Sequence, residues 1–233
     1  DYKITFLEDN CESLGARVGS DKLTGTFGDI STFSFFFSHH LNTVEGGMLL
    51  TDDADLADMA ICLRAHGWAR DLPSNSPLRP LPKHTGFSVD YEFILPGYNV
   101  RPTEIAAAVG LAQLGKLKVM EQHRVNNARD FTRAFMHDSR FTLQKQGRGA
   151  VPFGFTMICK STEARELFLG RLEAAGIEAR LITGGAFHKH PQSTFYNYSM
   201  GELPNAERAH DCGFFVGNHP FPLREQILAM RNA

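Results

Sequence analysis

The sequence predicts an α/β protein built from two parts, a larger one over residues 1–139 and a smaller C-terminal α/β domain over residues 140–233. Its 233 residues are 42% hydrophobic and 21% charged, which describes a globular chain that can bury a large core. Short apolar, β-branched runs in the first part are typical of buried strands. After residue 140, strand and helix patterns alternate, as in a compact α/β unit.

In the first part, strands are predicted over residues 4–7, 32–37 and 46–51. The helix expected over residues 52–64 has apolar positions at intervals of three and four, with Asp52 or Asp53 as its N-cap. Two long helices with apolar faces then follow, over residues 103–117 and 120–136. Between the helix over 52–64 and the helix over 103–117, residues 68–97 contain five prolines. They are expected to form a long loop that could cover a site.

The second part begins with a strand over residues 153–159 and a helix over residues 163–175. A strand over residues 177–182 and two later helices, 204–212 and 223–230, complete this domain.

Composition excludes several classes of function. A net charge of −2 with interspersed signs provides no basic stripe, so nucleic acid is not an expected partner. The apolar runs are too short to cross a bilayer, and we expect a cytoplasmic protein that does not bind membranes. The four cysteines stand far apart and predict free, mostly buried thiols. No metal site is expected, because the pairs His39-His40 and His188-Lys189-His190 lack a third ligand at suitable spacing.

The chain opens at Asp1 on the approach to a strand, with no helix or cap before it. We therefore expect an N-terminally truncated chain that begins inside the large domain.

The first candidate for chemistry is Glu8-Asp9-Asn10, because ligands in α/β sheets gather where strands end. Two acids at this place, Asp9 and Glu12, are able to hold a cationic heterocycle, and an aspartate facing a pyridine nitrogen keeps that nitrogen protonated. The alternative is that both carboxylates only cap the turn that follows the strand.

Two longer segments carry a resemblance to the DegT/DnrJ/EryC1/StrS sugar aminotransferases. The first runs from Gly28 through a serine-aromatic stretch to His39-His40-Leu41 and Glu45-Gly46-Gly47-Met48. The second is Leu95-Pro96-Gly97-Tyr98-Asn99-Val100-Arg101-Pro102 before a long helix. The resemblance runs from about Leu7 to the end. It implies fold type I of the pyridoxal-phosphate-dependent transferases, the aspartate aminotransferase-like fold, with a mainly parallel sheet in a partial large cofactor-binding domain.

Where this family carries the lysine that binds the cofactor covalently, the chain has His39. Histidine cannot form a Schiff base, so ordinary lysine-anchored transamination is excluded. The segment is similar to the histidine-containing branch of the family, the GDP-4-keto-6-deoxymannose 3-dehydratases. That branch implies a homodimer that uses pyridoxal 5'-phosphate and pyridoxamine 5'-phosphate, a nucleotide-linked 4-keto-6-deoxy sugar as substrate, and an amino donor such as glutamate. His39 is then the catalytic base.

The same resemblance assigns roles to other residues. Asp9 binds the ring nitrogen, Glu12 lies near the ring hydroxyl and Ser34 binds the phosphate. Asn99 and Arg101 reach into the neighbouring subunit's site. Taken alone, each of these residues has an ordinary structural explanation, as a turn or strand-end residue.

Substrate contacts are expected from three residues, His66, Trp68 and Arg180. A helix-terminal histidine and a packed tryptophan explain the first two nearly as well. Near Arg180, the residues Ala179, Leu181 and Ala186 depart from the family pattern. In the family, the loop that cradles the cofactor phosphate and the aromatic residue that stacks on the ring lie upstream of the position of Asp1.

Two alternatives remain open from the sequence. One is a catalytically silent relative with an interaction role, in which loss of the lysine ended the chemistry. The other is an iron–sulfur-dependent CDP-sugar 3-dehydrase, which is disfavoured because residues 69–76 lack the closely spaced cysteines that a cluster requires.

Overall fold

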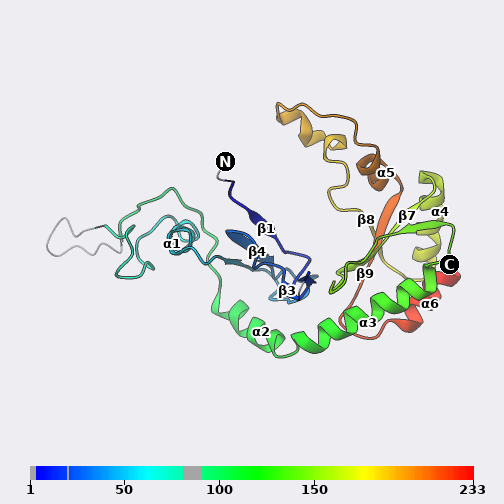
Figure 1. The fold of residues 1–233 in the computed structure, drawn as a ribbon, viewed down its shortest axis with the longest axis horizontal. Coiled ribbons are helices and arrows are strands. Elements are labelled where there is room, and N and C mark those ends of the chain that lie inside the picture. The colour runs from blue at the N-terminus through cyan, green and yellow to red at the C-terminus, as the bar shows by residue number, and fades with distance from the viewer. Residues whose placement is uncertain (1–3, 20, 81–90) are drawn as a thin grey trace. The chain divides into compact units, whose positions relative to one another are not determined.

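The computed structural model describes residues 4–19, 21–80 and 91–233. Two compact units divide the chain, Asp1–Leu117 and Lys118–Ala233 (Figure 1). This division lies earlier than the boundary expected at residue 140, because the long helix after Leu117 packs its side chains into the second unit. The approach to the predicted opening strand (1–3) and part of the proline-rich loop (81–90) lie outside the described residues.

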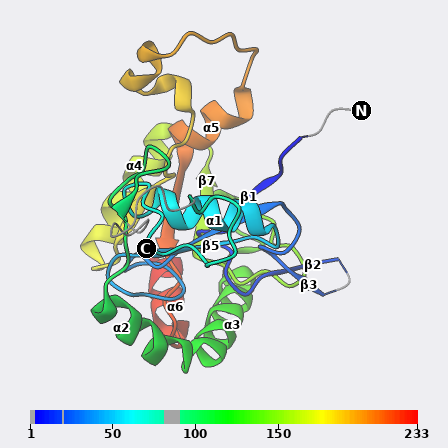
Figure 2. The same cartoon turned by 90° about the vertical axis from the view of Figure 1, so that its left-hand side faces the viewer.

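The first unit contains a three-stranded sheet in the order β1-β4-β5 and a two-stranded hairpin, β2-β3, which Figure 2 shows apart from the larger sheet. β4 pairs in parallel with β1 and antiparallel with β5, so the expectation of a mainly parallel sheet holds for one of these two pairs. The elements are β1 (Leu7–Asp9), β2 (Arg17–Val18), β3 (Lys22–Leu23), β4 (Ile30–Ser34), β5 (Gly47–Leu50), α1 (Ala54–Leu63) and α2 (Glu104–Leu114).

Both helices of this unit begin where the sequence predicts. The Asp53 carboxylate accepts hydrogen bonds from the backbone N–H groups of Asp55 and Leu56, and it is therefore the N-cap of α1. The Thr103 hydroxyl caps α2 in the same way. α2 has an apolar sequence, yet none of its residues is buried within this chain.

The second unit is a four-stranded antiparallel sheet in the order β6-β7-β9-β8, with helices packed beside it (Figure 1). Its central strand β9 was not predicted as a strand. It follows α5 directly at Gly213, so no loop separates the two elements in the sequence. The elements are α3 (Leu117–Phe135), β6 (Phe141–Leu143), β7 (Gly154–Cys159), α4 (Thr162–Ala174), β8 (Ala179–Leu181), two 3-10 turns η2 (Phe187–Lys189) and η3 (Pro191–Phe195), α5 (Pro204–Cys212), β9 (Gly213–Gly217) and α6 (Arg224–Asn232).

The hydrophobic core of the second unit is rich in phenylalanine. Phe155 of β7 stacks on Phe131 of α3 with ring centroids 4.5 Å apart, and Phe214 of β9 packs against Phe168 of α4. Burial alternates along β7, so one face of the sheet carries the core while α3, α4 and α6 supply the opposing side chains. No helix in the described part of the chain is long and apolar enough to cross a membrane.

A buried polar network joins α3 to the segment that follows β9. The amide nitrogen of Asn127 donates to the side-chain oxygen of Asn218 and to the carbonyls of His219 and Phe221. The amide oxygen of Asn127 accepts from the backbone N–H of Leu223. All four hydrogen bonds span more than 90 residues of sequence, so they fix the path of the chain between β9 and α6.

A second buried group, the Glu8 carboxylate, organises the first unit. It accepts hydrogen bonds from the backbone N–H groups of Gly25 (2.8 Å), Phe27 (2.6 Å) and Gly28 (2.6 Å). Burial raises the pKa of Glu8, but the bonds from Gly25, Gly28 and Phe27 outweigh burial and the net pKa is lowered. Glu8 therefore ties β1 to the turn that leads into β4.

Replacing Asn127 by alanine should destabilise the second unit by about 2–4 kcal/mol, because several buried polar partners lose their hydrogen bonds at once. Urea unfolding followed by far-ultraviolet circular dichroism measures the change. Asn126→Ala is the matched control, since Asn126 is an exposed neighbour on the same helix. Equal stability of the two variants would show that the network contributes little.

Replacing Glu8 by glutamine should cost about 1–3 kcal/mol at neutral pH, because hydrogen bonds to a charged acceptor are lost. The pKa of Glu8 is lower in the folded than in the unfolded protein, so this stabilisation is present above the unfolded pKa and is lost as the pH falls through the folded pKa. Wild type and Glu8→Gln should therefore converge in acid. Fluorescence of Trp68, the single tryptophan, reports unfolding of this unit. A difference that grows in acid, or an equal loss in the exposed control Glu12→Gln, would contradict this role.

Candidate active site

Asp9 is the last residue of β1 and lies at the carboxyl end of the parallel β1-β4 pair. It stands opposite Thr32 of β4, and its carboxylate accepts a hydrogen bond from the backbone N–H of Cys11 (3.1 Å). This bond closes a short turn, so the capping role considered for Asp9 is present. The carboxylate is nevertheless exposed, which leaves it available to a ligand at the sheet edge.

Beside the hydrogen bonds from Cys11, the charge of His39 contributes to the lowered pKa of Asp9. The Cys11 side chain and the Cys11 backbone N–H lower the pKa of Asp9, and the nearby His39 lowers it further. The structure therefore brings the predicted ring-binding acid and the predicted base into one neighbourhood. Asp9 is held in its ionised form there, as binding of a protonated ring nitrogen requires.

His39 lies in the loop that follows β4. Its backbone N–H donates to the carbonyl of Phe36, and its ring meets the Phe36 ring edge-on with centroids 5.8 Å apart. The Ser38 hydroxyl lies 3.5 Å from Nδ1 of His39. Sequence reasoning missed Ser38, which has no signal other than its place beside the histidine.

Ser34 ends β4 opposite Gly47, and its hydroxyl oxygen accepts a bond from the backbone N–H of Phe36 (3.2 Å). The strand-end explanation for this serine is thus observed, and its hydroxyl proton stays available as a donor. Glu12 is exposed and lies in the turn after Asp9, where its charge contributes to the raised pKa of the partly buried Cys11 thiol, after burial and Asp9.

Four other predicted residues form a second cluster, which consists of His66, Trp68, Asn99 and Arg101. The Trp68 ring packs against the rings of His66 (5.1 Å) and Phe93 (5.6 Å), and the Arg101 guanidinium lies 6.0 Å over it. Arg101 also donates to the side-chain oxygen of Asn99 at 3.5 Å. Two of the residues expected to contact substrate, His66 and Trp68, therefore lie beside the two expected to reach a partner subunit.

A tight crossing of two backbone segments builds this second cluster. Gly67 has φ +83°, and a Cβ atom there would collide with the carbonyl oxygen of Leu95; one at Gly97 would collide with the backbone of Gly67. His66, with φ 63°, also has a left-handed backbone and donates its N–H to the carbonyl of Tyr98 (2.7 Å). Strained backbone of this kind is often found at functional sites.

Arg180, the remaining predicted residue, belongs to the second unit. It lies on β8 opposite Phe215 of β9 and forms an ion pair with Glu178 at 2.9 Å.

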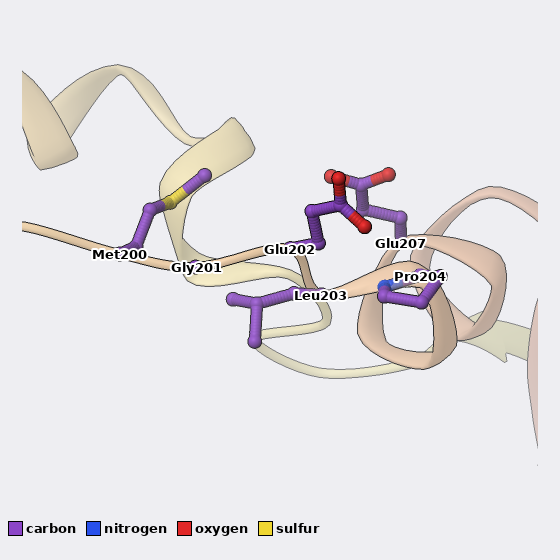
Figure 3. A pocket seen from close by; sticks show the side chains of 6 residues that line it. All are labelled: Met200, Gly201, Glu202, Leu203, Pro204 and Glu207. Atoms are coloured by element: carbon purple, nitrogen blue, oxygen red, sulfur yellow. The ribbon is translucent and has the colours of Figure 1, made fainter.

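The second unit also has a concavity of about 500 Å³. Figure 3 shows Glu202 and Glu207 with their carboxylates on the same side of the chain, and Glu207 pairs with His188 at 3.1 Å. None of the predicted site residues lines it, and among the described residues no group of three or more His, Cys, Asp or Glu side chains is arranged to hold a metal ion. Its lining residues are Met200, Gly201, Glu202, Leu203, Pro204 and Glu207.

The chain is similar to known nucleotide-sugar enzymes. It is 41% identical to the GDP-4-keto-6-deoxy-D-mannose 3-dehydratase of Yersinia pseudotuberculosis, covering 98% of this chain and 59% of that protein. The solved Escherichia coli GDP-4-keto-6-deoxy-D-mannose-3-dehydratase with bound hydrated PLP is 39% identical, with a TM-score of 0.91 over 98% of this chain and 60% of that one. The same kind of dehydratase, solved with a trapped PLP-glutamate geminal diamine, has 38% identity and a TM-score of 0.92, covering 99% of this chain and 61% of that one.

The chain thus spans about 60% of the length of the relatives it matches. The structural similarity confirms the predicted fold class, the aspartate aminotransferase-like α/β fold. The profile of the DegT/DnrJ/EryC1/StrS aminotransferase family matches residues 1–226, and the chain belongs to that family.

Proposed function

We propose that this protein is a pyridoxamine-phosphate-dependent 3-dehydratase that removes the C3 hydroxyl of a nucleotide-linked 4-keto-6-deoxy sugar, with GDP-4-keto-6-deoxymannose as the first candidate. The observation that carries the proposal is His39, in the electrostatic neighbourhood of Asp9, at the position of the family's lysine. Relatives at 39–41% identity over 98% of this chain are named as dehydratases of that GDP-sugar. The cytoplasmic location stays a prediction.

The described residues fit the cofactor. Asp9 is exposed, ionised and set at the end of β1, as a partner of a pyridinium nitrogen needs to be. The Ser34 hydroxyl, which accepts a hydrogen bond from the Phe36 N–H, can donate its proton to a phosphate oxygen. The exposed Glu12 is proposed to lie near the ring hydroxyl. Solved relatives contain PLP and a PLP-glutamate adduct, which supports pyridoxal phosphate as the cofactor and glutamate as the amino donor.

His39 supplies the proton transfers. When bound, the cofactor would supply an amine for the 4-keto group and an electron-accepting ring. His39 would take a proton from the carbon that bears this amine and return it to the C3 hydroxyl as that group leaves, since an imidazole both accepts and donates near neutral pH. Asp9 would keep the ring nitrogen protonated throughout. Hydrolysis would then release ammonia and a 3-deoxy keto-sugar, and glutamate as amino donor would restore the amine form of the cofactor.

His66 and Trp68 offer an aromatic and polar surface for the sugar nucleotide, and Arg180 of the small domain is proposed as a further substrate contact. A purine base suits Trp68, because rings stack on tryptophan. Phosphate groups pair with guanidinium groups, which is the role proposed for Arg180.

A homodimer with shared sites is part of the proposal. α2 exposes Ile105 (79%), Leu111 (73%) and Leu114 (56%), which a second copy of the chain would cover. Asn99 and Arg101 precede this helix directly and are exposed, which supports the proposal that they reach the site of the partner subunit.

Replacing His39 by asparagine should abolish dehydration and leave cofactor binding intact, because only the proton carrier is removed. The full-length protein is incubated with pyridoxal phosphate, glutamate and GDP-4-keto-6-deoxymannose, and ammonia and the sugar mass are followed. Wild type should release ammonia with loss of the C3 oxygen. An aminated sugar that keeps this oxygen would contradict the role of His39, and failure to bind the cofactor would favour the silent relative.

Replacing Leu111 by glutamate should convert a dimer into monomers, because a charge would be buried without a partner at the interface. Sedimentation velocity at micromolar protein measures the change. Leu167→Glu is the matched control, since Leu167 is a leucine of α4 with 62% exposure. A dimer that survives in Leu111→Glu would place the interface elsewhere.

A further inference from the structure

The loop that carries His39 is closed at its base by two backbone hydrogen bonds. Phe35 donates to the carbonyl of Gly46 (2.9 Å), and Thr43 donates to the carbonyl of Phe35 (2.9 Å). These bonds extend the β4-β5 hairpin and hold the two ends of the loop together. The conformation of the loop itself, from Phe36 to Glu45, then depends on interactions within the loop.

Within this loop, Val44 has a strained backbone. Its φ is 72°, in the left-handed region, where the branched Cβ crowds the backbone. The Val44 side chain is 65% exposed, so packing compensates for little of this cost. Other interactions must hold the residue in place.

Asn42 makes two of the interactions that oppose this strain, beside the Thr43 hydroxyl, which donates to the carbonyl of Glu45 (2.8 Å). The amide oxygen of Asn42 accepts a hydrogen bond from the backbone N–H of Val44 (2.7 Å), and its amide nitrogen donates to the carbonyl of Phe37 (2.8 Å). One side chain thus joins the segments before and after His39. Together these two hydrogen bonds oppose the strain at Val44.

We infer that Asn42 is a positioning residue for His39, and that it acts by holding the strained loop in a single conformation. This inference rests on the proposed role of His39 as the base. A base that must reach both a cofactor carbon and a leaving hydroxyl tolerates little displacement, and a misplacement of about 1 Å costs on the order of 100-fold in rate. Asp9 and Ser34 lie on strands outside the loop, so binding of the cofactor should not depend on Asn42.

The test combines two substitutions in the full-length protein. Asn42→Ala should lower kcat by about 10- to 100-fold, with cofactor affinity and KM for the sugar nucleotide close to wild type. Val44→Gly removes the backbone strain, because glycine adopts positive φ freely, and by itself it should change kcat by less than about threefold. Asn42→Ala combined with Val44→Gly should recover most of the lost kcat. Asn126→Ala, which removes an exposed asparagine of α3, is the control.

A second readout uses the protein without cofactor. The rate at which diethyl pyrocarbonate modifies His39, followed by tandem mass spectrometry of the peptide, should rise several-fold in Asn42→Ala and return toward wild type in the double variant. Turnover and His39 reactivity that are both unchanged in Asn42→Ala would overturn the inference while the proposed function stands. A wild type without dehydratase activity, but with the expected changes in His39 reactivity, would overturn the proposed function and keep the structural role of Asn42.

Discussion

The first unit depends on one buried charge, the Glu8 carboxylate. It binds the backbone N–H groups of Gly25, Phe27 and Gly28, which belong to the turn that enters β4. Because Glu8 is itself part of β1, these hydrogen bonds hold the turn next to β1, and β4 then runs beside β1. The pairing of Asp9 with Thr32 follows from this arrangement, and the acidic strand end and the strand leading to His39 share an edge.

The two clusters of predicted residues are built by different physical means. Asp9 and Ser34 stand on strands, whose hydrogen-bonded register fixes them, whereas Trp68 and Arg101 stand on segments that cross too closely for any side chain at Gly67. The strand register and the close crossing of backbone segments are both rigid, so each cluster of side chains keeps its own geometry. Loop residues alone would not provide that precision.

The sequence predicts those parts of the structure that depend on residues close together in the chain. The α1 cap at Asp53 and the strand around Thr32 follow from neighbouring residues, and the candidate site follows from short motifs that resemble a family. The network of Asn127 and Asn218 connects residues 91 apart, which no local pattern reports. β5 was expected as a buried strand, but all four of its residues are exposed in this chain, because burial depends on what packs against a strand rather than on its own sequence.

The strained backbone at Val44 was equally invisible in the sequence, and its importance follows from the proposed role of His39 in place of a lysine. A lysine that binds its cofactor covalently is oriented by that bond, whatever its loop does. A histidine has no such bond, so its orientation depends on its backbone, the Phe36 ring beside it and the loop around it. A chain that uses His39 as a base therefore needs a loop with one conformation, and the hydrogen bonds of Asn42 on either side of His39 provide that constraint.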